Sequence, residues 1–137
     1  MIVSDIFVSD ITSAHDFYCR KLPFRCLSLT RPAPGDKGFM IVGGGMLGDC
    51  RIRIRAPRNP DLLNLLNQER GARVHFRKAK IGPVHQHVKR HLPELCIISD
   101  SWGELSNGHF AGPYEFPGGS ALYARDPFGN FLLFSEW

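Results

Sequence analysis

The sequence contains no hydrophobic run that approaches the length of a membrane-spanning helix. Such a helix needs about 20 consecutive apolar residues, and none of the 137 residues lies in such a run. The N-terminal stretch MIVSDIFVSD also lacks the basic and then apolar layout of a secretion signal. We therefore expect a cytoplasmic protein with no membrane partner. With 43% hydrophobic residues, the chain can form one domain with its own core.

Cysteine pairs and phosphate-binding loops are missing as well. The four cysteines are scattered and form no Cys-x-x-Cys motif, which favours reduced, buried thiols over disulfides or a zinc site. The glycine-rich stretch GGGMLG precedes a predicted strand and not the helix N-terminus that a phosphate-binding loop requires. The net charge of +4 permits an acidic partner without identifying one.

Hydrophobic periodicity predicts an α+β pattern that occurs twice along the chain. Each half begins with a strand and a helix, and further strands follow. In the first half we expect a strand over 2–8, a helix over 12–22 capped by Asp10 or Thr12, and strands over 25–30, 38–44 and 49–57. A connecting helix over 61–69 leads to a strand over 72–78, a helix over 83–92, strands over 94–99 and 120–125, and a final strand after the turn DPFGN.

The two halves share residues at a fixed offset of 70 positions. Six of the sixteen columns that align 11–26 with 81–96 are identical, well above chance for average composition. The identical pairs are Ile11/Ile81, His15/His85, Arg20/Arg90, Leu22/Leu92, Pro23/Pro93 and Cys26/Cys96. The chain is therefore predicted to contain two copies of one strand-helix-strand-strand-strand unit.

Two stretches resemble a known family. FVSDITSAHDFYCRKLPF is similar to the opening of the vicinal oxygen chelate superfamily, and ARDPFGNFLLF is similar to its last turn and strand. This is the glyoxalase, bleomycin-resistance and extradiol-dioxygenase group. The resemblance implies a single glyoxalase-like domain of two βαβββ modules, which form paired curved mixed sheets around a cleft. We expect module one over about 1–57, a linker helix over about 60–71 and module two over about 72–137.

Metal-dependent members of that family hold a divalent ion with two histidines and a glutamate. By the resemblance and the repeat, these ligands would fall at Val3, Arg73 and Leu133. Valine and leucine offer no lone pair, and arginine is a fixed cation. The displaced pair His75 and Glu136 would need a bulge, because Glu136 alternates to the other face of its strand. We therefore expect no metal and no other cofactor.

Strand alternation then predicts what lines the cleft. If the apolar residues of each strand face the helices, Asp5 and Phe7 of the first strand turn inward with Val3. The same parity turns five arginines inward: Arg51, Arg53, Arg55, Arg73 and Arg77. Such a basic cleft suits a carboxylate or phosphate ligand. The alternative is an ordinary strand whose arginines lie in water.

Further site candidates come from a histidine and from aromatic residues. His75 alternates with Arg73 and Arg77, so it is either a core histidine or a base with a lowered pKa. The predicted loop 99–120 is expected either to bind a ligand or to cap the barrel with its own rings. Its candidate contacts are Trp102, Phe110 and Tyr114, and Tyr123 follows on the next strand.

Three functions fit these features. The first is a metal-independent binding protein of the bleomycin-resistance type with an anionic or aromatic ligand, although a basic cleft argues against the cationic bleomycin itself. The second is a lyase or isomerase that acts on a small anionic substrate through His75. Nucleic-acid binding is third, because the charge is modest and no recognised motif accompanies it.

The resemblance also implies a homodimer. The last strand FLLFSEW is apolar on both faces, with Phe131 and Leu133 on one and Leu132 and Phe134 on the other. A half-exposed strand would alternate, so we expect this one to be covered on both sides, by a helix and by the other module or a partner chain.

Overall fold

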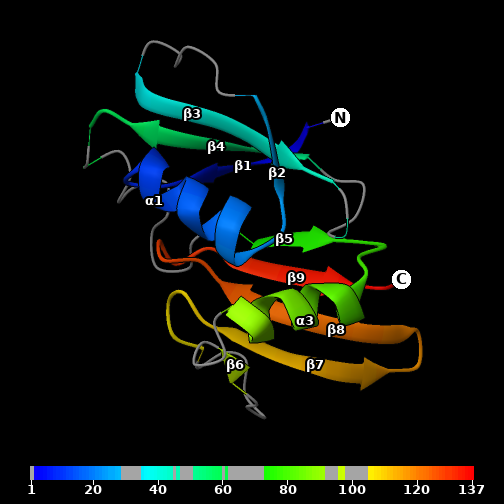
Figure 1. The fold of residues 1–137 in the computed structure, drawn as a ribbon. Helices are drawn as coiled ribbons and strands as arrows, with labels where there is room; N and C mark the ends of the chain where they lie inside the picture. Colours follow the sequence, from blue (N-terminus) through cyan, green and yellow to red (C-terminus); the bar gives the residue numbers. More distant parts are fainter. Residues whose placement is uncertain are drawn as a thin grey trace.

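The computed structural model describes residues 2–28, 35–44, 46, 51–59, 61, 73–91, 96–97 and 105–137. Two β-sheets lie one above the other in Figure 1, each accompanied by helical segments. This α+β arrangement of paired mixed sheets is the one that the sequence predicted. The predicted linker helix lies outside the described residues, apart from the helical residue Asp61. No helix among the described parts of the chain is long and apolar enough to cross a membrane.

The N-terminal sheet has four strands in the order β1-β4-β3-β2. Its strands are β1 (Ile2–Phe7), β2 (Arg25–Ser28), β3 (Asp36–Gly43) and β4 (Arg51–Pro57). Strands β1 and β4 are parallel, whereas the other pairs are antiparallel.

One helical segment connects β1 to β2. It starts as α1 (Ile11–His15) and continues as the π-helix η1 (Asp16–Lys21). Asp10 caps it, since its carboxylate accepts hydrogen bonds from the Ser13 amide at 3.0 Å and from the Ser13 hydroxyl at 2.7 Å. The predicted helix over 12–22 is thus present with the first of its two suggested caps.

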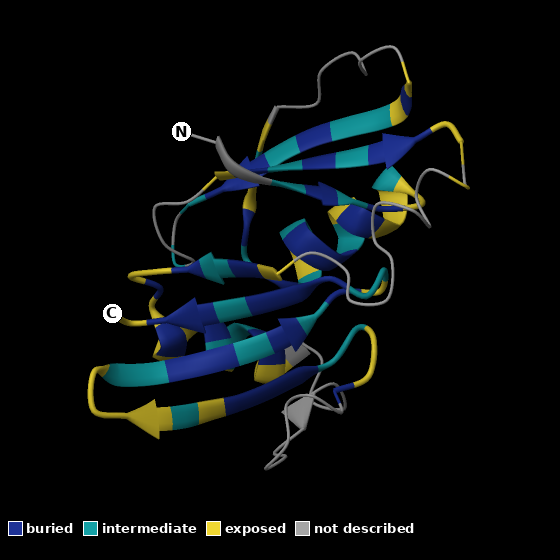
Figure 2. Ribbon diagram, turned by 180° about the vertical axis from the view of Figure 1, so that it is seen from behind, coloured by how far each residue is buried: buried dark blue, intermediate teal, exposed yellow. Residues whose placement is uncertain are grey.

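The C-terminal sheet has five strands in the order β5-β9-β8-β7-β6. Its strands are β5 (Arg73–Phe76), β6 (Cys96–Ile97), β7 (Phe110–Phe116), β8 (Gly119–Arg125) and β9 (Phe131–Ser135). Helix α3 (Ile81–His91) follows β5. It lies in front of this sheet in Figure 1 and behind it in Figure 2.

The repeat predicted from the sequence is visible in the topology. Strands β5, β9, β8 and β7 repeat the order β1-β4-β3-β2, and α1 and α3 begin 70 residues apart, at Ile11 and Ile81. Two details of the prediction are wrong. Strand β7 lies within the predicted loop and takes the place that β2 has in the first sheet. Strand β6, which the repeat aligned with β2, is an additional edge strand parallel to β7.

The core joins the helix-facing sides of both sheets. Ile6, Ile52 and Ile54 of the N-terminal sheet belong to the same buried cluster as Phe76 and Phe134 of the C-terminal sheet. The buried and half-buried positions alternate along the strands in Figure 2. The predicted parity is therefore confirmed for β1, β4 and β5, and on β4 and β5 the arginines and His75 lie on the face opposite the core.

The turn before the last strand is a buried polar junction. The Asp126 carboxylate is fully buried and accepts hydrogen bonds from the Tyr18 hydroxyl, the Asn130 side chain, and the amides of Phe128 and Asn130. The Asn130 amide group also donates to the Phe7 carbonyl at 3.3 Å. The turn that resembled a family motif thus connects the last strand to η1 and to the end of β1.

Candidate functional site

The face of the N-terminal sheet that points away from the core carries paired charges. Arg53 donates to the Asp5 carboxylate through Nε at 2.6 Å and through a terminal nitrogen at 3.0 Å. These donors lower the pKa of the Asp5 carboxyl, because they favour its ionised form. Arg55 donates to Asp36 at 2.8 Å, and Asp36 is almost completely buried.

The same arginines also lie over aromatic rings. The Arg53 guanidinium is 5.9 Å from the centre of the Phe39 ring, and that of Arg55 is 5.6 Å from the centre of Phe7. The side chains of Arg53 and Arg55 thus point away from the core as predicted, but both are already hydrogen-bonded to carboxylates of the same chain. Arg51 is exposed at the start of β4. This face is less able to attract an anion than the count of its arginines suggests.

The corresponding face of the C-terminal sheet is different, and its side chains form two rows across three strands. Strand register places Phe131 of β9 between Arg73 of β5 and Arg125 of β8. The next row lies two residues away along each strand and consists of His75, Leu133 and Tyr123. We call these six residues the open face.

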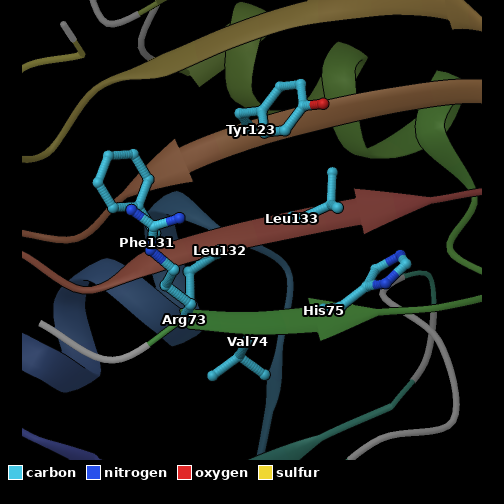
Figure 3. Close-up of a pocket in the computed structure, with 7 residues that line it drawn as sticks. All are labelled: Arg73, Val74, His75, Tyr123, Phe131, Leu132 and Leu133. Carbon is cyan, nitrogen blue, oxygen red and sulfur yellow. The ribbon is translucent and has the colours of Figure 1, made fainter. Parts of the chain in front are cut away.

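A hollow of about 250 Å³ lies on the open face. Figure 3 shows the seven residues that line it: Arg73, Val74, His75, Tyr123, Phe131, Leu132 and Leu133. Phe131 is 7% exposed and Leu133 is half-buried, so the floor is apolar. Polar groups stand at its margins, which is the usual composition of a small-molecule site.

Two guanidinium groups converge on Phe131. The guanidinium carbon of Arg125 lies 4.1 Å from the centre of the Phe131 ring, and that of Arg73 lies 5.5 Å from it. Both contacts are within the range of a cation–π interaction. They explain why Phe131 is buried although it points away from the core. The core therefore covers one face of the last strand. On the other face, arginine side chains of the same chain cover Phe131.

His75 is held in one orientation by the last strand. Its Nε2 lies 2.7 Å from the hydroxyl of Ser135, and that hydroxyl donates to the Trp137 carbonyl at 3.1 Å. A serine hydroxyl has one proton, so Nε2 is the donor to Ser135 and Nδ1 carries the lone pair of the neutral ring. Partial burial, and then the charge of Arg77, lower the pKa of His75. The ring is therefore neutral at pH 7.

Aromatic side chains extend the open face beyond the hollow. Tyr114 of β7 packs against Tyr123 with ring centres 5.7 Å apart. Burial raises the pKa of Tyr123, so its hydroxyl stays protonated near neutral pH. Trp137 contacts the rings of His75 and Phe116 at 6.5 and 5.6 Å, and both Trp137 and Phe116 are more than a third exposed.

The residues predicted from the sequence do not form one site within this chain. Asp5, Phe7, Arg51 and Arg53 belong to the N-terminal sheet, whereas Arg73, His75 and Tyr123 line the hollow. Arg77 is exposed just beyond β5, and Tyr114 lies next to Tyr123.

Among the aromatic candidates, the prediction for Phe110 is wrong. It is 1% exposed and stacks on Phe17 with ring centres 5.6 Å apart, so it belongs to the core. Trp102 lies outside the described residues.

Arg125 was missed by the sequence analysis, although a signal for it was present. It lies two residues after Tyr123 on the same strand, and strand alternation places both on one face. Its Nε is buried without a hydrogen-bond partner.

The family's divalent metal does not fit the residues at the expected positions. Arg73 places its guanidinium over Phe131, and Leu133 contributes an apolar surface to the hollow. Glu136 is exposed, and its carboxylate accepts from the Ser120 amide on the neighbouring strand. Within the described parts of the chain, no three residues of the types His, Cys, Asp or Glu gather into a group that could hold a metal ion.

Comparison with known proteins gives matches among solved structures. No family model matches the sequence, and no curated protein matches it. The bleomycin-binding protein of Streptomyces verticillus, in complex with copper(II)-bleomycin, superposes with a TM-score of 0.63 at 17% identity, over 100% of this chain and 96% of that one. A bleomycin resistance determinant encoded on the transposon Tn5 gives 0.63 at 19% identity over 97% and 94%.

A third match is an antibiotic-binding protein. TnmS3 from Streptomyces sp. CB03234 superposes with a TM-score of 0.57 at 18% identity, over 98% of this chain and 93% of that one. The chain therefore has the fold of the glyoxalase/bleomycin resistance proteins, as the sequence resemblance predicted. Because this fold carries many activities, the ligand must be argued from the residues of the open face.

Proposed function

We propose that this protein binds a small, planar, anionic molecule on the open face of the C-terminal sheet and needs no metal to do so. The observation that carries the proposal is the apolar hollow over Phe131 and Leu133, which Arg73 also lines, with Arg125 packed on the Phe131 ring. Bleomycin-binding and antibiotic-binding proteins of the same fold support a binding function.

The size of the hollow favours a small ligand. Pockets for drug-sized molecules have volumes of roughly 300–1,000 Å³, whereas the hollow measures about 250 Å³. A single aromatic ring or a fused pair of rings fits this space better than a molecule as large as bleomycin. Flat rings also match a floor made by one phenyl ring and one leucine.

The charge around the hollow favours an anion. Arg73 and Arg125 belong to the open face, Arg77 is exposed just beyond it, and none of the six residues of the open face carries a carboxylate. On the N-terminal sheet, Asp5 and Asp36 pair with Arg53 and Arg55. These ion pairs also argue against nucleic acid as the ligand, because two of the three arginines of β4 are already bound to carboxylates of the same chain.

We propose further that the functional form is a homodimer. The open face leaves Leu133 half-buried and Phe116 and Trp137 partly exposed. A second copy over this surface would cover these groups and enlarge the site. A cytoplasmic location and the module boundaries at about 57 and 72 stay predictions.

The binding function is tested with 2-naphthoate as a planar anionic probe in isothermal titration calorimetry. We expect saturable binding to the wild-type protein and no binding to Leu133→Trp, which fills the hollow. Leu27→Trp is the matched control, because Leu27 is exposed on β2. Absence of binding to the wild-type protein, or equal binding to Leu133→Trp, would refute the proposal.

An enzyme is the second candidate, and one observation favours it. His75 presents a neutral ring with a lowered pKa at the edge of the hollow, as a general base does. A lyase or isomerase would convert its ligand, whereas a binding protein returns it unchanged. Proton NMR of a bound ligand after prolonged incubation with the protein distinguishes the two.

A further inference from the structure

A second hollow lies on helix α3, away from the open face. It measures about 300 Å³. The described residues that line it are His85, Gln86, Lys89 and Arg90. The other side of α3 packs into the core through Val84 and Val88. Because α3 covers the side of the C-terminal sheet that carries the core, this hollow and the open face lie on opposite sides of the sheet.

The four lining residues share one side of α3. A helix turns by about 100° per residue, so these positions fall within an arc of about 140°. His85 lies one turn before Lys89, and Gln86 lies one turn before Arg90. Gln86, Lys89 and Arg90 are exposed, and His85 is half-buried. Their polar groups are therefore accessible to a ligand from the same direction.

The two cations of this hollow have no carboxylate partner. The helix sequence IGPVHQHVKRH contains neither aspartate nor glutamate. Within the described part of the chain, Lys89 and Arg90 form no ion pair and no hydrogen bond through their side chains. Two positive charges on adjacent residues repel each other, and an anion bound between them would relieve this repulsion.

The internal repeat shows which substitutions produce this charge. The offset of 70 residues aligns Gln86, Lys89 and Arg90 of the second copy with Asp16, Cys19 and Arg20 of the first. In the first copy, Arg20 forms an ion pair with Asp16 at 2.8 Å, one turn earlier in the helix. In the second copy, an uncharged glutamine stands in place of the aspartate, and a lysine stands in place of the cysteine. Each of these two differences makes α3 more positive by one charge.

We propose that the hollow on α3 is a second binding site, which takes the phosphate group of a small phosphorylated molecule. A phosphate monoester carries up to two negative charges at pH 7 and so matches two cations, whereas a carboxylate carries one. The guanidinium, ammonium, amide and imidazole groups around the hollow can all donate hydrogen bonds to phosphate oxygens. A volume of about 300 Å³ is at the lower end for ligand pockets, so the molecule is small.

The test is a titration of the isotope-labelled protein with glycerol 3-phosphate, followed by amide chemical shifts. A phosphate-free buffer of low ionic strength limits the screening of these exposed charges. We expect saturable shifts in α3 and little change in β5, β8 and β9. Acetate, as a singly charged comparison, should have a roughly 3- to 10-fold higher dissociation constant.

The sharpest variant is Gln86→Asp, which restores the acid and arginine pair of the first copy. It should weaken glycerol 3-phosphate by roughly 10-fold, because the new carboxylate both pairs with Arg90 and repels the phosphate. Lys89→Gln should also weaken binding. Arg25→Gln is the matched control, since it lowers the net charge by the same amount at an exposed position on β2 and should leave the affinity unchanged. Melting temperatures establish that each variant is folded.

Four outcomes would overturn the inference. The site is absent if millimolar glycerol 3-phosphate gives no saturable shifts in α3, or if folded Gln86→Asp binds it as tightly as the wild-type protein. Equal affinity for acetate would show that the hollow does not select phosphate. If a short DNA duplex shifts α3 whereas glycerol 3-phosphate does not, the helix binds a polyanion and not a small molecule. The binding function of the open face is tested separately with 2-naphthoate and does not depend on these results.

Discussion

The hydroxyl of Tyr18 donates a 2.7 Å hydrogen bond to the carboxylate of Asp126, 108 residues further along the chain. Both side chains are fully buried. Burial raises the pKa of Asp126, although Tyr18, Asn130 and two backbone amides oppose this effect by stabilising the ionised form. Tyr18 belongs to η1 and Asp126 to the turn before β9, so this bond ties the two sheets together.

Substitution Tyr18→Phe should lower the free energy of unfolding by about 1–3 kcal/mol, because a buried carboxylate loses one of its donors. Urea denaturation measures the effect. Tyr123→Phe is the control, since Tyr123 is half-buried on the open face and lies away from this junction. Equal stability of the two variants would contradict the structural role of the Tyr18 hydroxyl.

A second prediction concerns Gly38 on β3. A Cβ atom at this position would overlap with Cγ1 of Ile11, the first residue of α1. Gly38→Ala should therefore destabilise the protein by about 1–3 kcal/mol, and the additional substitution Ile11→Ala should relieve part of the overlap. A Cβ atom at Gly82 in α3 would meet open space, so Gly82→Ala should stabilise by up to about 1 kcal/mol. The two alanine variants, compared by thermal denaturation, should shift the melting temperature in opposite directions.

The lowered pKa of His75 predicts a pH dependence of stability. The folded protein binds this proton less readily than the unfolded chain, so the free energy of unfolding falls as the pH falls through about 6.5, the ordinary histidine value. The decrease ends below the pKa of the folded state. Urea denaturation between pH 5 and 8 should show this contribution in the wild-type protein and its loss in His75→Asn. Parallel curves for the two proteins would show that His75 has no such linkage.

The dimer is tested by sedimentation equilibrium at micromolar concentration. We expect twice the monomer mass of 15.4 kDa. Phe134→Asp is not a suitable dimer-breaking variant, because Phe134 is fully buried in the core and this change would unfold the chain. Trp137→Asp is the better variant, because Trp137 is 39% exposed at the end of the open face. A wild-type protein that sediments as a monomer at micromolar concentration would refute the dimer.

The sequence was informative where one local pattern determined the structure. Alternation along β4 and β5 correctly separated Ile52, Ile54 and Val74 from the arginines, because a strand places successive side chains on opposite faces. The repeat offset also matches the starts of α1 and α3. The sequence prediction failed beyond the helices, where a glycine and a proline in FAGPYEF suggested a loop although pairing with β8 makes this segment a strand.

The site was harder to predict, because charge pairing depends on which strands become neighbours. The sequence could not show that Asp5 would lie opposite Arg53, since β1 and β4 are far apart in the chain. It therefore predicted one basic cleft, whereas the structure divides these arginines between two sheets and pairs Arg53 and Arg55 with Asp5 and Asp36. Arg125 was overlooked because its importance follows from the packing of its side chain on Phe131.

The central claim is that the open face of the C-terminal sheet binds the ligand. The most direct measurement is a titration of the isotope-labelled protein with 2-naphthoate, followed by amide chemical shifts. We expect saturable shifts in β5, β8 and β9, largest near Arg73, His75, Tyr123 and Leu133, with little change around Arg53 and Arg55. Shifts that gather on β1 and β4, or no saturable shifts at millimolar ligand, would contradict this claim.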